Sequence, residues 1–147
     1  MTCLTLIFFY FFSPGVFLGG INYLSEENTV IVHRLVHTRT SIDDTYFFPV
    51  TEIVEYELNA EQIMELRRLL RNSWYRRRFA DWITYGIPLT TKSFYTYRIF
   101  ISNTERSIIL SILPGGFLER GWGYDDKFRI RNSTWEETLL RILSSCE

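Results

Sequence analysis

The sequence predicts an α+β fold in which two helices pack on one face of an antiparallel sheet of about five or six strands. Short segments rich in β-branched and aromatic residues are joined by turns that are too short for a parallel crossover, so neighbouring strands should pair antiparallel. Two other segments have the three- and four-residue apolar spacing of amphipathic helices. The predicted order is β-β-α-β-β-(β)-β-α, preceded by a hydrophobic N-terminal segment.

The first two predicted strands flank a polar segment. Residues 29–37 (TVIVHRLVH) are rich in β-branched residues, which favour strands. Residues 46–58 (YFFPVTEIVEYEL) alternate from Glu52 onward, so one face of this strand should be buried and the other wet. The polar residues 38–45 between them predict a loop. Pro49 cannot donate a ladder hydrogen bond, so it indicates a sheet edge, a bulge or a strand start.

The first helix is expected from Ala60 to about Arg76. Asn59 and Gln62 have the spacing of a capping box, in which each side chain accepts a hydrogen bond from the other residue's backbone N–H. Acidic residues come early and arginines late, which complements the helix dipole and places Glu65 near Arg68. The apolar stripe consists of Ile63, Leu66, Leu70 and Trp74.

The second half of the chain predicts a meander of three or four strands and a final helix. Ser133 and Glu136 have capping-box spacing for a helix from Thr134 to about Ser144. Pro114, Gly115 and Gly116 predict one of the tight turns of the meander. The expected strands are residues 94–103, 106–113, 117–124 and 127–131.

Composition excludes several classes of protein. The chain has 147 residues, of which 46% are hydrophobic, and this suits one globular domain. Its formal net charge of −1 argues against a strongly basic nucleic-acid binder and against an acidic solvating tail. Aromatic residues make up 17% of the chain, enough to build a core and to argue against disorder.

All charged side chains lie beyond residue 25, so we expect a hydrophobic segment at 1–25 and one α+β domain at 26–147. The segment has three interpretations. A secretory signal peptide would use 4–12 as its apolar region, although no basic residue precedes that run. A membrane anchor would use 4–24, which is long enough to span a bilayer of about 30 Å. The third interpretation is a core segment of a soluble protein. Membrane targeting is the favoured expectation, because uncharged runs of this length are unusual in soluble proteins.

An arginine-rich helix face is the first candidate binding site. Arg67, Arg71 and Arg78 fall on similar azimuths of the predicted helix, with Trp74 close by. Such a face suits a phosphate, an anionic lipid or an acidic partner. The competing interpretation is an ordinary solvated face with salt bridges, which the nearby acidic residues favour.

An aromatic, glycine-bent stretch is the second candidate. Residues 117–128 (FLERGWGYDDKF) place Trp122 and Tyr124 between glycines and beside two aspartates. Exposed aromatic rings next to acids suit a peptide, a sugar or a cation. The competing interpretation is a bent hairpin whose aromatic residues belong to the core.

The sequence shows no catalytic or metal-binding pattern. His33 and His37 would lie roughly 13 Å apart on a strand, which is too far for one metal ion. Cys3 and Cys146 form no Cys-x-x-Cys pair, and a disulfide between them needs both ends of the chain side by side. No glycine-rich phosphate loop or Ser-centred elbow is present. An enzymatic alternative would pair His33 or His37 with an aspartate.

These observations predict a non-catalytic binding or interaction domain that is exported or membrane-tethered through residues 4–24. The expected partner is a protein or another macromolecule; nucleic acid is not favoured, and no cofactor or metal is expected. The alternative is a soluble cytoplasmic inhibitor or immunity-type protein, in which residues 4–24 belong to the core. The sequence sets no oligomeric state.

Overall fold

A computed structural model describes residues 21–42, 45–71, 73–75, 92–120, 128–130 and 132–145. Its helices are η2 (Ile21–Tyr23, a 3-10 helix), α2 (Ala60–Arg71) and α3 (Trp135–Ser144). Its strands are β1 (Thr29–Thr38), β2 (Thr40–Ile42), β3 (Thr45–Phe47), β4 (Val50–Glu57), β5 (Ser73–Tyr75), β6 (Ser93–Ser102), β7 (Ser107–Leu113), β8 (Phe117–Arg120) and β9 (Phe128–Ile130).

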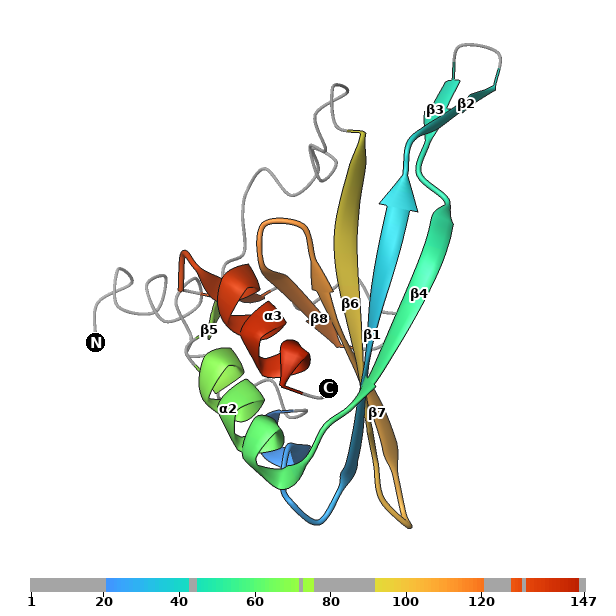
Figure 1. The fold of residues 1–147 in the computed structure, drawn as a ribbon. Coiled ribbons are helices and arrows are strands. Elements are labelled where there is room, and N and C mark those ends of the chain that lie inside the picture. Colours follow the sequence, from blue (N-terminus) through green and yellow to red (C-terminus); the bar gives the residue numbers. More distant parts are fainter. Residues whose placement is uncertain are drawn as a thin grey trace, which may run out of the picture.

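These elements confirm the predicted α+β class. The described strands form a seven-stranded sheet in the order β4-β1-β6-β7-β8-β9-β5 and a small second sheet of β2 and β3. Every pair of neighbouring strands is antiparallel. Helices α2 and α3 lie side by side on one face of the large sheet (Figure 1). The expected layer of two helices on an antiparallel sheet is therefore present.

Strand β1 organises the sheet, because it pairs with β4 on one side and with β6 on the other. Its β-branched residues Val30 and Val32 face the helices and are fully buried. They meet Ile101 and Ile99 across the β1–β6 pair. The side chains of Leu66, Leu70, Leu139 and Ile142 complete this core from the helices.

The N-terminal end of the described chain belongs to this core. Ile21 is 1% exposed and Leu24 is fully buried, and both pack in the same cluster as the helices and the sheet. The folded unit therefore includes Ile21, which lies before the expected boundary between residues 25 and 26. Residues 1–20, with Cys3 and most of the uncharged run, lie outside the described residues. No helix that the structure describes is both long and apolar enough to span a bilayer.

The predicted first helix is shorter than expected. It ends at Arg71, and Trp74 lies instead on β5, opposite Arg129 of β9. The placement of Trp74 on the apolar stripe was therefore wrong, and Leu69 is the buried apolar residue of α2 that the prediction missed. The aromatic pair Trp74-Tyr75 favours an extended backbone, and pairing with the sheet satisfies that backbone.

The segment before β4 also differs from its prediction. Residues 38–45, expected as a loop, contribute most of a short hairpin formed by β2 and β3 (Figure 1). The strand expected at 46–58 is interrupted at Pro49, and β4 begins directly after it. The register opposite shifts between Val36 and His37. Pro49 thus marks a strand start and an irregularity in the pairing, two of the roles that its missing N–H predicts.

The second predicted capping box was wrong. No side chain caps α3 at its N-cap residue, Thr134. The Asn132 Oδ1 atom instead accepts hydrogen bonds from the Thr134 backbone N–H at 3.0 Å and from its hydroxyl at 2.9 Å. The Glu136 carboxylate, expected to bond back to Ser133, accepts a hydrogen bond from the Tyr97 hydroxyl at 3.3 Å. Glu136 therefore bonds to Tyr97, which is distant in sequence, and not to its neighbour Ser133.

The first predicted capping box is confirmed. The Asn59 backbone N–H donates to the Gln62 Oε1 atom at 2.8 Å, and the Gln62 N–H donates to Asn59 Oδ1 at 3.0 Å. Gln62 is also buried, and its Nε2 donates to the Ile142 carbonyl and the Ser145 hydroxyl, each at 3.0 Å. One amide therefore caps the start of α2 and the end of α3.

A salt bridge forms a second connection between α2 and α3. The Glu65 carboxylate lies 3.6 Å from the guanidinium of Arg141 on α3, and not against Arg68 as predicted. The Arg141 side chain is largely accessible to water and that of Glu65 is partly accessible, so the pair contributes little to stability. The buried amide of Gln62 is the stronger of the two connections.

The Gln62→Glu substitution tests that connection. Glutamate still accepts the Asn59 N–H, but it places a carboxylate oxygen where Nε2 donated to the Ile142 carbonyl. We expect the free energy of unfolding to fall by about 2–4 kcal/mol in urea denaturation. The exposed Met64→Gln variant on the same helix is the control, with an expected change below about 0.5 kcal/mol. Equal stability of the two variants would contradict a structural role for the amide.

Candidate functional site

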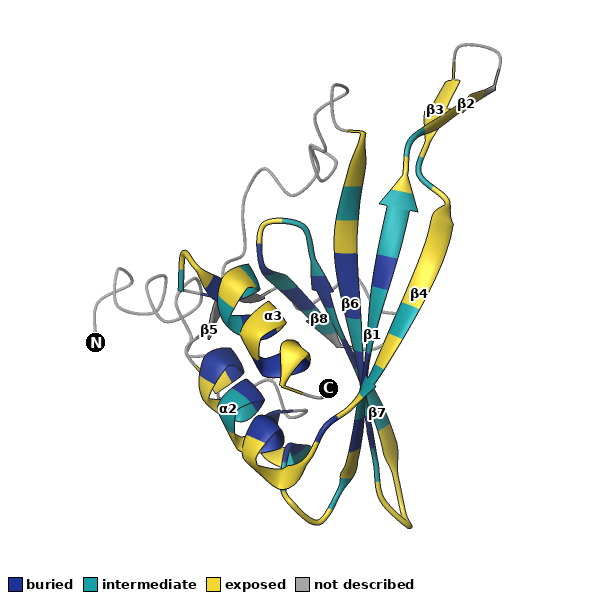
Figure 2. Cartoon of the chain, viewed as in Figure 1, coloured by how far each residue is buried: buried dark blue, intermediate teal, exposed yellow. Residues whose placement is uncertain are grey.

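One end of the large sheet extends beyond the helices. Strands β1, β4 and β6 continue past α3, and the β2–β3 hairpin lies beyond them at the far end (Figure 1). We call this part the arm and define it as residues 34–42, 45–53 and 92–96. Exposed residues are frequent along β4 and the hairpin, whereas the part of the sheet beneath the helices is mostly buried (Figure 2).

The arm carries most of the exposed large hydrophobic residues that the structure describes. Apart from Met64 on α2 and Leu140 on α3, every exposed large hydrophobic side chain that the structure describes lies on the arm. Ile53, at 60%, is the most exposed of all. Exposed hydrophobic residues gathered on one part of a protein are typical of interaction surfaces. On the arm they occupy both faces of the sheet, since Ile53 is opposite Leu35 and Tyr95 is opposite Val36. The members on the arm are Tyr46, Phe47, Val50, Ile53 and Tyr95.

Among the strands that the structure describes, β4 forms one edge of the large sheet, and its outward backbone groups can be identified. The Leu58 N–H donates to the Val30 carbonyl at 3.0 Å, which fixes the hydrogen-bonding phase of the β1–β4 pair. Residues of an antiparallel pair alternate between bonding to the partner strand and facing away from it. Ile53, Glu55 and Glu57 therefore direct their backbone N–H and C=O groups toward the outer edge.

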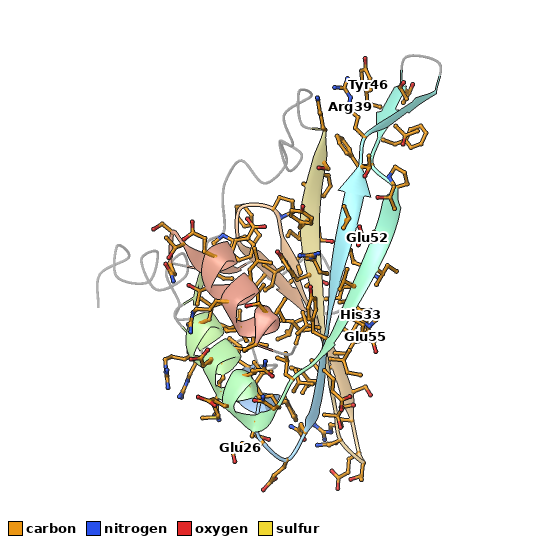
Figure 3. The ribbon with its side chains drawn as sticks, viewed as in Figure 1. Glu26, His33, Arg39, Tyr46, Glu52 and Glu55 are labelled. Atoms are coloured by element: carbon orange, nitrogen blue, oxygen red, sulfur yellow. The ribbon has the colours of Figure 1, made fainter. Side chains whose placement is uncertain are left out.

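The side chains of β4 are acidic. Its sequence, VTEIVEYE, contains Glu52, Glu55 and Glu57, and it has no lysine or arginine. All three carboxylates are exposed. Glu52, in the part of β4 that belongs to the arm, and Glu55, beyond the arm, follow each other along the strand (Figure 3). The edge therefore combines available backbone groups with negative charge.

Glu55 is held in place by His33. The His33 Nε2–H donates to the Glu55 carboxylate at 2.8 Å, and the two residues are opposite each other in register. This pair does not exchange backbone hydrogen bonds, so its side chains approach closely. The His33 ring also packs against Phe100, with 4.6 Å between ring centroids. Glu55 is still 63% exposed, so it remains available to a partner.

The enzymatic alternative paired a histidine with an aspartate, and every aspartate of the chain lies outside the described residues. The carboxylate beside His33 is that of Glu55. A histidine next to a carboxylate can act as a general base if a nucleophile lies within hydrogen-bond reach. Across the sheet, His33 is opposite Arg98, and Arg98 is opposite Ser111. Ser111 is thus two strands away, or about 10 Å. That distance leaves no contact between the histidine and this hydroxyl; Cys146 lies outside the described residues.

His37 has a structural place in the arm. Its Nδ1–H donates to the Phe48 carbonyl at 3.1 Å, and the Thr96 hydroxyl lies 2.8 Å from Nε2. The ring also stacks on Phe94, at 4.7 Å between centroids. These contacts fasten the segment before β4 to β6. His33 and His37 do not converge, and the described residues contain no His, Cys, Asp and Glu cluster able to hold a metal ion.

The tip of the arm is held by a second set of contacts. The Arg39 guanidinium lies over the Tyr46 ring, 3.8 Å from its centroid, and both residues are at the far end of the arm (Figure 3). The Arg39 backbone N–H donates to the Lys92 carbonyl at 2.8 Å. The hairpin is therefore tied to the start of β6.

A groove of about 540 Å³ lies where the arm meets the start of α3. Its apolar walls are Phe94, Tyr95, Trp135 and Leu140, and its acidic groups are Glu136 and Glu137. The Tyr97 ring lies nearby in an edge-to-face contact with Trp135. Burial, followed by the negative charge of Glu136, raises the pKa of the Tyr97 hydroxyl above its ordinary value.

The site residues predicted from sequence have different outcomes. Arg67 and Arg71 lie on α2, where Arg67 is half-buried and Arg71 is exposed. Trp74 lies on β5, so the helix face that was expected to carry it does not contain it. Arg78, Trp122 and Tyr124 lie outside the described residues. The exposed apolar group on the arm was not predicted, although Ile53 alternates with acidic residues and was a visible signal.

No protein-family model, curated protein or solved structure matches this chain.

The Tyr97→Phe variant tests the buried hydroxyl next to the groove. The pKa of Tyr97 is higher in the folded state than in the unfolded chain, where it is about 10. The unfolded state therefore loses this proton first as pH rises, and the related stability is present below about pH 10 and lost above it. Urea unfolding should show a steeper alkaline loss for the wild type than for Tyr97→Phe. Parallel curves would contradict this, and Tyr56→Phe is the matched control.

Proposed function

We propose that this domain is a non-catalytic protein-binding module that contacts its partner through the arm. The observation that carries the proposal is the grouping of Tyr46, Phe47, Val50 and Ile53 outside the layer covered by helices. Exposed aromatic and branched side chains contribute most when another protein buries them. Strand β1, paired along both sides, would hold Val50 and Ile53 of β4 in one conformation.

The charges of β4, the edge strand whose first residues belong to the arm, favour a protein over a nucleic acid. Three carboxylates line β4, whereas nucleic-acid binding depends on basic groups that neutralise phosphates. The Arg39 guanidinium, the basic group nearest the exposed ring of Tyr46, already packs on that ring. An apolar surface with an acidic border suits a partner with apolar residues and basic neighbours.

The contacts of the two histidines support a non-catalytic role. His33 donates to an exposed carboxylate, and His37 holds two segments of the arm together. Each histidine thus has a structural explanation. We therefore propose that neither serves as a catalytic base.

We further propose that the domain is exported or membrane-tethered through its uncharged N-terminal residues. Because Ile21 and Leu24 belong to the core, the available apolar run shortens from 4–24 to 4–20. Transmembrane helices have roughly 17–25 residues, and this run is at the short end of that range. The shorter run therefore favours a signal peptide over a membrane anchor. The alternative, a cytoplasmic inhibitor or immunity-type protein, would use the same arm.

Truncation and fractionation separate these locations. We expect the full chain, with a C-terminal tag, in the membrane fraction or the medium, and the chain lacking residues 1–20 in the cytosol and folded. Removing residues 1–24 should also unfold the domain, because Ile21 and Leu24 are lost and each contributes about 2–5 kcal/mol. Mass spectrometry of the mature N-terminus distinguishes cleavage from anchoring. A wholly cytosolic full-length chain would contradict export.

Cross-linking tests the arm as the contact surface. We expect the double variant Tyr46→Ser, Ile53→Ser to lose most of the proteins cross-linked to the wild type in its native cells. The matched control, Met64→Ser with Leu140→Ser, changes exposed apolar residues on the helices and should keep them. Circular dichroism checks that both variants fold, since surface changes of this kind cost little stability. An unchanged set of cross-linked proteins in the arm variant would contradict the proposal.

A further inference from the structure

We infer that β4 binds an extended, basic segment of the partner as an additional antiparallel strand of the sheet. This inference rests on the proposed protein-binding function and specifies its contact. Strand addition requires a sheet edge with free backbone groups, and it takes its specificity from alternating side chains. Within the described part of the chain, β4 has outward backbone groups without a partner strand and side chains that alternate between the two faces.

The backbone of β4 is suited to accept a strand. Among the described residues, β4 pairs only with β1, and it continues for eight residues, Val50–Glu57. The phase set by the bond from Leu58 to Val30 leaves the N–H and C=O groups of Ile53, Glu55 and Glu57 facing outward. An antiparallel strand would bond to these three residues without disturbing the β1–β4 pair.

The side chains of β4 select the chemistry of that strand. Ile53, Glu55 and Glu57 lie on the face opposite the helices, in register with Leu35, His33 and Ile31 of β1. Glu52, Val54 and Tyr56 lie on the other face. Directly opposed residues of antiparallel strands interact most strongly when charges are opposite and apolar residues meet. The added strand should therefore carry lysine or arginine opposite each glutamate and apolar residues opposite Ile53 and Val54.

The structural alternative is that the glutamates only protect the edge from aggregation, which is a common use of charge on edge strands. Acidic residues do oppose pairing with a second copy of this chain, because two β4 strands would bring six carboxylates to one seam. Protection alone leaves Ile53 unexplained, since it is 60% exposed in the middle of the strand. An edge that repels itself and offers an apolar contact favours a basic partner strand.

His33 strengthens the preference of β4 for a basic strand by fixing the position of the Glu55 carboxylate. It holds the Glu55 Oε2 atom at 2.8 Å, while the carboxylate stays largely exposed. Fixing the carboxylate in advance lowers the entropy that an incoming cation would have to remove. Glu55 is thus the anchoring charge of the edge.

A synthetic peptide tests the inference on the full chain. Acetyl-Lys-Tyr-Lys-Val-Ile-Lys-amide, aligned antiparallel, places its lysines opposite Glu57, Glu55 and Glu52 and its isoleucine opposite Ile53. The control peptide has glutamate in place of each lysine. We expect the basic peptide to bind, as measured by NMR titration, and the acidic peptide not to bind. The amides of Ile53, Glu55 and Glu57 should exchange hydrogen more slowly in the complex, because they become hydrogen-bonded.

One double variant tests the contribution of charge to peptide binding, and two single variants test the contribution of the backbone. Glu55→Lys with Glu57→Lys should weaken the basic peptide by about tenfold or more and allow the acidic peptide to bind. Ile53→Pro removes an outward N–H and should weaken binding more than Ile53→Ala, which removes only the side chain.

The outcomes distinguish this inference from the proposed function. Equal binding of both peptides, no binding of the basic peptide, or binding without amide protection would overturn strand addition. If native partners still depend on the arm in that case, protein binding by the arm stands without strand addition. If the arm variants lose no native partner, the proposed function itself fails, whatever the peptides do.

Discussion

The side-chain amide of Gln62 joins the two helices that cover the sheet. Its oxygen accepts the backbone N–H of Asn59 at the start of α2, and its nitrogen donates to the Ile142 carbonyl near the end of α3. Leaving a buried amide without these partners costs about 1–3 kcal/mol, so the two helix ends are held in one relative position. The core between helices and sheet depends on this arrangement, because Leu66, Leu70, Leu139 and Ile142 reach the same strands from two helices.

The helix layer is too short to cover the whole sheet. Helices α2 and α3 span 12 and 10 residues, and they cover only the part of the sheet nearest η2 (Figure 1). The arm must then be stabilised within the sheet itself. His37 does this through Phe48 and Thr96, and Arg39 does it through Tyr46 and Lys92. Apolar side chains on the arm consequently have no helix to pack against, which is why they are exposed.

Local patterns predicted local structure well, and they failed where a distant partner decided the outcome. β-Branched residues located β1, alternation located β4, and capping-box spacing located the start of α2. The same spacing at Ser133 failed because Glu136 bonds to Tyr97, which is distant in sequence. Trp74 has helical spacing, but it lies on β5 because the edge of β9 offers pairing. For the site, Ile53 stood out on an acidic face, but its position at a sheet edge depends on the order β4-β1-β6, which no local pattern contains.

The acidic side chains of β4 can be understood from the risk that an exposed edge strand pairs with the wrong strand. A long edge strand with exposed branched residues invites pairing with any other strand, including a copy of itself. Three glutamates oppose self-pairing through like charge, yet they leave the outward groups of Ile53, Glu55 and Glu57 accessible. Because His33 already holds Glu55, the repulsion acts from a fixed position. An edge built in this way discriminates by charge: it disfavours its own copies and acidic segments, and it favours strands that bring basic side chains into register with the glutamates.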